Sequence, residues 1–415
     1  MIKKIKNFYN SINLIEKSLF ILFSLFPIAF ILGNFSINLL FFLISIIFII
    51  DTIVNKDYSF LKDPIFFLLI IFFLSLIINV FFSMHFVNSI PRVLKILLMI
   101  LFVLQSKRYI QKYPKEFEEI IFGFWSLVFF IVVLDGIFEI IFGFNTLGFS
   151  TQLTGRIAGF FGEELVLGGF FFSFCLIFTT YIASLNKNYK KLILIIISLL
   201  IVVSFLIGER SNFIKFFLSL SFLSFFLIKL KLKYFITSFI LLFSVLFLFI
   251  NFNDGANNRY YGQIKKIYSI NKINNYIKES PYGAHYNAAY KIFKEYPIFG
   301  IGIKNYRIES NKEKYKNDKY KWTKFRSTTH PHQIHYEFLS ETGIFGYLIF
   351  LIFILFSLFL SIKNYLKYKN TFQLSGILYV IFSLTPILPS GSFFSTFASG
   401  LFWINYSIMV SYNKE

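Results

Sequence analysis

Histidines supply the most informative chemistry in this sequence. Of its five histidines, His330, His332 and His335 lie together directly before an apolar segment. The spacing of His332 and His335 suits a zinc-binding pair, but cysteine and carboxylate partners at zinc-like spacing are missing, so no metal or other cofactor is expected. A histidine also serves as a general base, because its ordinary pKa is close to neutrality. A histidine that only satisfies hydrogen bonds at an interface is the alternative.

Two arginines form the second group of candidates. Arg156 lies in the segment Thr154-Gly155-Arg156-Ile157-Ala158-Gly159-Phe160-Phe161, and Arg210 follows Gly208-Glu209. A guanidinium group binds a phosphate or a carboxylate through two parallel hydrogen bonds. The alternatives are anchoring by lipid headgroups and local pairing, for example of Glu209 with Arg210.

Other charged or titratable residues are secondary candidates for contact with a substrate. Asp135 and Glu139 share one helix face, as do Arg92 and Lys95, and the alternative for each pair is internal pairing or snorkelling. The remaining candidates lie in one polar insert and comprise His285, Arg307 and Arg326, together with His330, which could orient His332, and His335.

Long apolar runs must position these residues. Hydrophobic residues make up 56% of the 415 residues, and repeated apolar runs of about 17–25 residues are long enough to cross a bilayer as helices. We expect twelve spans, at about 18–33, 37–54, 64–83, 90–106, 119–143, 165–185, 191–207, 211–228, 234–252, 336–362, 372–388 and 392–410. The predicted fold class is therefore all-α, a polytopic integral membrane protein. The first span is expected to be a signal anchor.

The distribution of positive charge predicts the orientation. A net charge of +20 would suggest nucleic acid in a soluble protein, but here Lys and Arg lie mostly in short loops between spans, so no nucleic acid partner is expected. One set of alternate short connections holds 20 Lys and Arg, and the opposite set holds 3. Short basic loops stay cytoplasmic, which predicts that both termini are cytoplasmic. The insert then faces outward.

Three segments follow from this topology. Residues 1–251 would form spans one to nine, residues 252–335 the outer insert with His332, and residues 336–415 spans ten to twelve. Within the insert, Ala288, Ala289, Ile292 and Phe293 form an apolar helical stripe that Pro297 ends, and 312–324 is a lysine-rich loop that could act as a mobile lid. Cys175 lies in an apolar run and supports no disulfide framework.

Several stretches resemble one known family. The run His330-Pro331-His332-Gln333-Ile334-His335, followed by Glu341-Thr342-Gly343-Ile344-Phe345-Gly346, is similar to the signature of the O-antigen ligase and O-antigen polymerase superfamily. The element Arg156 to Phe161 and the run Glu295-Tyr296-Pro297-Ile298-Phe299-Gly300-Ile301-Gly302 resemble two further motifs of that superfamily. Two departures are Gln333, where the family usually has Asn, and Glu163-Glu164, where many ligases have Pro-Asn.

The resemblance implies an activity. Members of this superfamily transfer a glycan from undecaprenyl diphosphate, with inversion and without a metal, to a sugar hydroxyl on the periplasmic face of the bacterial inner membrane. In an O-antigen ligase the acceptor is the lipid A core, and in a polymerase it is a growing glycan. His332 would act as base, and Arg156 and Arg210 would stabilise the departing diphosphate in place of a metal.

Alternatives stay open at this point. The chain could be an O-antigen polymerase or a protein O-oligosaccharyltransferase instead of a ligase. A transporter or flippase of lipid-linked sugars belongs to another class, in which inverted repeats and broken, charged helices at mid-membrane are typical. The distinctive polar residues here lie at the outer edge of the predicted spans instead, which favours surface chemistry.

Overall fold

The computed structural model describes residues 2–151, 155–162, 164–185, 190–228, 244, 247, 275, 277–386 and 388–414. Regular elements within these ranges are all helical, as predicted for an all-α membrane protein. Among the residues that the structure describes, six helices are long and apolar enough to cross a membrane, or seven if the bent pair Leu14–Ser24 and Phe26–Leu32 forms one span. Helices also lie in the other predicted spans that the structure describes. The predicted span 234–252 lies outside the described residues, apart from Ser244 and Phe247. The total of twelve spans stays a prediction.

The chain packs into two compact units, each assembled from three stretches. Unit 1 comprises Met1–Leu40, Tyr109–Lys265 and Lys369–Ser383, and unit 2 comprises Phe41–Arg108, Lys266–Tyr368 and Leu384–Glu415. Helices α4 (Asn34–Asn55) and α6 (Phe86–Lys112) run from one unit into the other. The predicted boundaries near 251 and 335 concern sides of the membrane rather than packing, and they stay predictions.

Unit 1 is a bundle held by aromatic packing. Phe26 and Phe174 pack edge-on against Trp125, whose indole N–H donates to the Phe23 carbonyl at 2.8 Å. Such rings bury large apolar areas while the indole N–H keeps a partner. The described elements of this unit are α1 (Ile2–Ser11), α2 (Leu14–Ser24), α3 (Phe26–Leu32), α7 (Pro114–Glu116), the π-helical turn η2 (Phe117–Ile121), α8 (Phe122–Phe142), η3 (Gly159–Phe161), α9 (Leu167–Leu185), α10 (Lys190–Leu206), α11 (Arg210–Ile228) and α19 (Thr371–Ser383).

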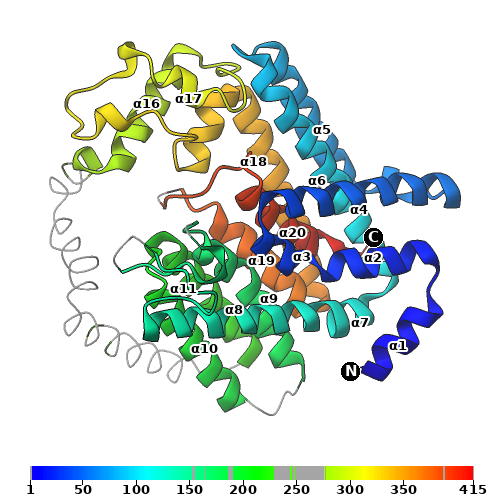
Figure 1. Ribbon diagram of the computed structural model, residues 1–415. Coiled ribbons are helices and arrows are strands. Elements are labelled where there is room, and N and C mark those ends of the chain that lie inside the picture. The colour runs from blue at the N-terminus through cyan, green and yellow to red at the C-terminus, as the bar shows by residue number, and fades with distance from the viewer. Residues whose placement is uncertain are drawn as a thin grey trace. The chain divides into compact units, whose positions relative to one another are not determined.

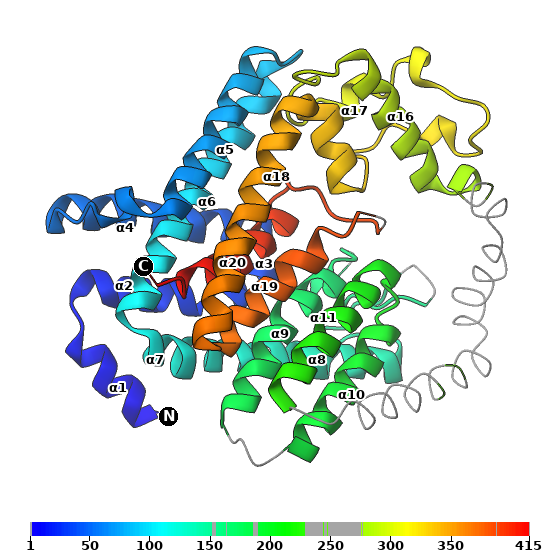
Figure 2. The same ribbon diagram turned by 180° about the vertical axis from the view of Figure 1, so that it is seen from behind.

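Unit 2 is built around the long helix α18 (Ile334–Tyr368). Helices α5 (Pro64–Phe81) and α16 (Pro281–Glu295) pack against α18, as Figures 1 and 2 show from opposite sides. Phe72 of α5 stacks on Phe353 of α18, with ring centroids 4.9 Å apart. The remaining described elements of this unit are η1 (Ser59–Lys62), α5 (Pro64–Phe81), α16 (Pro281–Glu295), α17 (Tyr306–Glu309), η5 (Glu313–Tyr315), η6 (Thr323–Phe325) and α20 (Phe397–Ser411).

Helix α18 is broken at Gly343, which has φ +64° and ψ −170°. A break leaves carbonyl groups without partners on one side and N–H groups without partners on the other. The loop at 297–302 supplies both kinds of partner. Its Ile301 and Gly302 N–H groups donate to the carbonyls of Ser340 and Glu341, and its Pro297 and Ile298 carbonyls accept from Ile344 and Phe345 N–H, all at 2.8–3.1 Å.

The side chain of Asn79 on α5 completes this junction. Its amide donates to the carbonyls of Phe299 (2.7 Å) and Glu341 (3.0 Å), and its oxygen accepts from Ile303 N–H (3.2 Å). Asn79 is 1% exposed, and a buried amide that kept only some of these bonds would cost about 1–3 kcal/mol per lost partner. Helix α5, the loop that contains Phe299 and Ile303, and helix α18 at Glu341 are thereby fixed to one another.

The junction makes a testable demand on Gly343. A Cβ atom at this position would lie 2.3 Å from the Ile298 carbonyl oxygen, and the left-handed conformation alone costs a non-glycine residue about 1–2 kcal/mol. Gly343→Ala should therefore lower the melting temperature of the detergent-solubilised protein by more than the control Gly33→Ala. Gly33 also has a positive φ (+99°), but no atom lies within 4 Å of its added Cβ. Equal losses in the two variants would contradict the close approach.

Candidate active site

His332 lies in the turn that leads into α18, with an imidazole that is only partly buried. Its φ of +56° is in the left-handed region, which non-glycine residues rarely adopt and which is often found at functional sites. The Ser390 N–H holds this turn by donating to the His332 carbonyl at 2.9 Å. The ring itself makes no hydrogen bond to any residue that the structure describes. Its nitrogens are therefore available to a bound molecule.

Three aromatic rings surround the His332 imidazole. The centroid distances are 4.2 Å to His330, 5.3 Å to His285 of α16 and 5.9 Å to Tyr282 of the same helix. Among the described residues no group of three or more His, Cys, Asp or Glu side chains is arranged to hold a metal ion. The structure thus brings together three of the predicted site histidines as a packed cluster of rings.

Hydrogen bonds distinguish the other histidines from His332. In His330, the ring contacts the Thr329 hydroxyl through Nδ1 (3.0 Å) and the Ser390 carbonyl through Nε2 (3.4 Å). His335 does not join the cluster. Its Nε2–H donates to the Leu384 carbonyl (2.9 Å), so its Nδ1 accepts from the Tyr347 hydroxyl (3.0 Å). These two rings are held by both nitrogens, which suits a positioning role.

Burial changes the acid–base behaviour of the cluster. Desolvation, followed by the neighbouring His330 and His285, lowers the pKa of His332 to about 3. Desolvation, followed by the Lys304 charge, lowers the pKa of His330 to about 4. The pKa of His332 thus lies below the near-neutral value that is typical of a histidine base. The sequence gives the spacing of the histidines but not the depth at which their rings are buried.

Gln333 caps α18 and ties it to the segment at 384–396. Its side-chain oxygen accepts from the Tyr336 N–H at 2.9 Å, which is the bond that an N-cap residue makes. Its amide nitrogen donates to the Pro386 carbonyl at 2.6 Å. Glutamine thus fills this position with two defined bonds where the family usually has asparagine.

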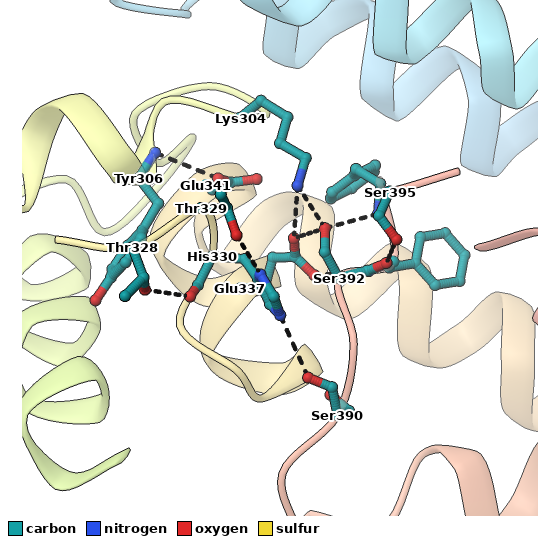
Figure 3. A network of polar contacts seen from close by, with 12 residues as sticks. Lys304, Tyr306, Thr328, Thr329, His330, Glu337, Glu341, Ser390, Ser392 and Ser395 are labelled. Carbon is teal, nitrogen blue, oxygen red and sulfur yellow. Dashed lines mark hydrogen bonds and ion pairs between the residues drawn. The ribbon is translucent and has the colours of Figure 1, made fainter. Parts of the chain in front are cut away.

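A buried polar network lies one turn further along α18 (Figure 3). Glu337 is 0% exposed and accepts from the Ser392 hydroxyl and from the Phe393 N–H, the latter at 2.8 Å. Lys304 lies 3.9 Å from Glu337 and donates to Ser392 at 2.7 Å. Like His332, Lys304 has a positive φ (+64°). A buried carboxylate needs such partners, so this network fixes the 384–396 segment beside the histidine cluster.

Arg92 and Lys95 of α6 belong to the same electrostatic neighbourhood. The Lys95 ammonium donates to the Phe394 carbonyl (3.2 Å) and the Thr396 hydroxyl (3.4 Å), and the charges of Arg92, Lys304 and Glu337 act on it. No ion pair joins Arg92 to another described residue. Arg92 and Lys95 carry the same charge and cannot pair with each other. Together with Lys304 they outnumber the single Glu337 carboxylate, so we call Arg92, Lys95 and Lys304 a basic patch.

In unit 1, Arg156 lies beside the turn that carries Arg210. Its guanidinium contacts Glu209 at 3.1 Å and donates to the Leu165 carbonyl at 3.3 Å, while its buried Nε has no partner among the described residues. The Ile157 N–H donates to the Ile207 carbonyl at 3.3 Å. Glu209 therefore forms an ion pair with Arg156, which is distant in sequence, whereas local pairing had suggested its neighbour Arg210.

Asp135 and Glu139 hold the loop that carries Arg156. Glu139 accepts from the Ala158 N–H (3.1 Å) and the Gly159 N–H (2.6 Å). Asp135 accepts from the Thr146 N–H at 2.9 Å, and its second oxygen is buried without a partner among the described residues. Both acids thus position the loop, and contact of either with a substrate stays a prediction.

The polar insert has a small core of its own. Ala288, Ala289 and Ile292 of the predicted stripe are buried against Tyr306 and Tyr315, and α16 ends at Glu295 as Pro297 predicts. Figure 1 shows α16 and α17 (Tyr306–Glu309) next to each other. The Tyr306 hydroxyl donates to the carbonyls of His285 (3.0 Å) and Arg326 (3.1 Å).

Arg326 and Tyr315 hold the lysine-rich segment 312–324 against the insert, and its movement as a lid stays a prediction. Arg326 is 4% exposed and donates to the carbonyls of Asn311 (2.8 Å) and Lys312 (3.0 Å), and Tyr315 is 2% exposed. Arg326 is thus committed to holding the insert together. Arg307 is exposed, and its carbonyl accepts from the Ser327 hydroxyl at 2.8 Å.

Sequence reasoning assigned no role to Lys304, Glu337, Glu341 or Asn79. A signal for the two glutamates was present, because they lie four residues apart at the start of an apolar span, where acids are costly and usually functional or paired. Glu341 is 0% exposed, accepts from the Tyr306 N–H at 3.3 Å and has a second oxygen without a partner in the described chain. Lys304 and Asn79 carry no local signal, since their partners are remote in sequence.

An O-antigen ligase family model matches residues 192–351. This match confirms the resemblance to the O-antigen ligase and polymerase superfamily. It spans the 297–302 loop, the histidines and the break at Gly343, and it supports an O-antigen ligase or polymerase type of activity in a membrane glycosyltransferase-like enzyme. A search of curated proteins found no match.

The lowered pKa of His332 can be measured directly. An imidazole in the unfolded chain takes up its proton near pH 6.5, whereas folded His332 does so only near pH 3. Its ring resonances, assigned by difference from His332→Asn in histidine-labelled protein, should therefore not shift between pH 8 and pH 5. Acidification across this window should also lower the free energy of unfolding, because only the unfolded chain binds the proton. A midpoint between pH 6 and 7 would contradict the burial of this ring.

Proposed function

We propose that the chain is an O-antigen ligase. It would transfer a glycan from undecaprenyl diphosphate, with inversion, to a sugar hydroxyl of the lipid A core at the periplasmic face of the bacterial inner membrane. The observation that carries the proposal is the His332 ring, which is neutral, open to a bound molecule and located directly before α18, within the segment that the family model matches. The donor is already activated, so the reaction needs no ATP on that face.

The orientation is supported by the ends of α18. The part of α18 after its break at Gly343, residues 344–368, is long enough to cross a hydrocarbon core of about 30 Å. Lys363 and Lys367 lie near its C-terminal end, and short basic loops stay cytoplasmic, which puts the His332 end outside. Both chain termini are then cytoplasmic in the proposed topology.

His332 would remove the acceptor proton as the new glycosidic bond forms. A base with a pKa of about 3 does not ionise a free sugar hydroxyl. The hydroxyl oxygen becomes strongly acidic, however, once it starts to bond to the anomeric carbon. A late proton transfer to a neutral imidazole is therefore sufficient, and burial ensures that the imidazole is neutral throughout the physiological range.

The departing diphosphate requires positive charge, which would take the place of a metal ion. In unit 2, the patch of Arg92, Lys95 and Lys304 supplies it next to the histidine cluster. In unit 1, Arg156 and Arg210 keep the donor-binding role that the sequence predicts. Burial raises the pKa of Glu209, against the opposing effect of Arg156, so a proton on Glu209 would release the Arg156 guanidinium for an anion.

The second candidate is an O-antigen polymerase, which shares the donor and the chemistry. A protein O-oligosaccharyltransferase differs only in the acceptor. The remaining alternative, a transporter or flippase of lipid-linked sugars, would not require a neutral imidazole with open nitrogens. These functions predict different products in the same cells.

Complementation of a deletion strain tests the proposal. Loss of all glycan on the lipid A core, with long lipid-linked chains accumulating, would support a ligase, whereas attachment of single repeats would indicate a polymerase instead. The wild-type chain should restore the lipopolysaccharide ladder, and His332→Asn should lower transfer by about 10²–10⁴-fold. Asparagine is chosen because it tolerates a positive φ better than alanine. Wild-type transfer by His332→Asn at equal abundance would refute the base assignment.

Arg156→Lys tests the role of the guanidinium. Lysine keeps the charge and can still pair with Glu209, but it cannot form two parallel bonds to a phosphate. The variant should raise the donor KM of the purified protein while its melting temperature stays close to that of the wild type. Unchanged donor KM and turnover would indicate that Arg156 only anchors its loop.

A further inference from the structure

Three tyrosine rings stack one on the next beside His332. Tyr282 and Tyr286 come from the first turns of α16, and Tyr336 comes from the first turn of α18. The rings of Tyr286 and Tyr336 stack at 5.0 Å with an interplanar angle of 12°, and Tyr282 lies 6.3 Å from Tyr286. We call these three residues the tyrosine platform.

The platform is open at Tyr282 and rigid beneath it. Tyr282 is 40% exposed, and its ring centroid lies 5.9 Å from that of His332. The start of α16 is fixed by Ser280, whose hydroxyl accepts from the Gly283 N–H at 3.0 Å. Gly283 packs so closely on the Ile277 carbonyl that a Cβ atom would lie 1.8 Å from it. The exposed ring is therefore presented by a well-anchored helix turn.

The chemistry of this surface suits a sugar ring. It carries no charged side chain, so it does not suit a phosphate group. A pyranose presents C–H groups of slight positive character, which pack on the negative face of an aromatic ring, and hydroxyls at its edge. The Tyr286 hydroxyl is buried without a hydrogen-bond partner among the described residues. An unsatisfied buried hydroxyl is unfavourable, so a ligand group that formed a hydrogen bond with it would be stabilised.

The distances suit a reaction at the neighbouring imidazole. A ring packed on the exposed face of Tyr282 would lie about 4 Å above it, at van der Waals contact. A hydroxyl on such a ring extends sideways, and the adjacent His332 is close enough to accept a hydrogen bond from it.

We propose that the tyrosine platform is the acceptor subsite, in which Tyr282 binds the face of the pyranose whose hydroxyl is directed at His332. This inference rests on the proposed glycosyl transfer and assigns its acceptor side. Tyr282 is then a positioning residue that acts through binding.

The kinetic test uses the full-length protein in nanodiscs, with rough lipopolysaccharide from the deletion strain as the acceptor. Tyr282→Leu should raise the acceptor KM by about 5–10-fold with a nearly unchanged kcat and donor KM, because it removes the ring face. Tyr282→Phe keeps that face and should behave like the wild type. Tyr368→Leu is the matched control, since Tyr368 is also 40% exposed but lies at the opposite end of α18.

Three results would overturn the platform. They are an unchanged acceptor KM in Tyr282→Leu, a defect in Tyr282→Phe as large as that of Tyr282→Leu, and a fall in melting temperature with no change in KM. The last result would assign Tyr282 to anchoring at the membrane surface.

A binding measurement separates failure of the platform from failure of the proposed function. If the wild-type protein transfers no glycan, saturation-transfer NMR with the acid-released core oligosaccharide still reports contact with the protein. Binding that Tyr282→Leu abolishes and Tyr368→Leu retains supports the platform even then. Equal binding by the wild type and Tyr282→Leu contradicts it.

Discussion

The exchange of backbone hydrogen bonds between the 297–302 loop and the broken helix α18 is the constraint on which unit 2 depends. A helix break within an apolar span is tolerated only if protein groups replace the missing helical bonds. Here the loop bonds to the helix on both sides of the break, and Gly343 allows the backbone to turn. The Asn79 amide donates to the loop at Phe299 and to the helix at Glu341. The runs 295–302 and 341–346, which resemble two motifs of the family, therefore belong to one hydrogen-bonded junction.

This junction determines what lies on either side of it. On the loop side, it places Lys304 with a left-handed backbone next to Ser392 and Glu337. On the helix side, it fixes the first turns of α18, from which Gln333 reaches the 384–396 segment. Ser390 then holds the His332 carbonyl. The candidate base is thus positioned by contacts of its neighbours, while its own imidazole stays open.

Some of this arrangement could be predicted from the sequence. The histidine group, the stripe of α16 and the stop at Pro297 are local patterns, and local patterns survive folding. The partner of Glu209 was not predictable, because Arg156 reaches it from 53 positions earlier in the chain, and adjacency suggested Arg210. The lowered pKa of His332 was not predictable for a related reason. The ring is buried by His285 and Tyr282, and this burial is a property of the packed insert. The lysine-rich segment appeared polar enough to be mobile, yet Tyr315 and Arg326 anchor it.

The central claim is that His332 performs its chemistry on the periplasmic face, and accessible cysteine labelling tests it most directly. The sole native cysteine, Cys175, is buried and can be replaced by serine, after which Thr329→Cys places a thiol on an exposed residue three positions from His332. The account predicts that a membrane-impermeant maleimide labels this thiol in intact spheroplasts. Labelling that occurs only after the membrane is permeabilised would contradict it.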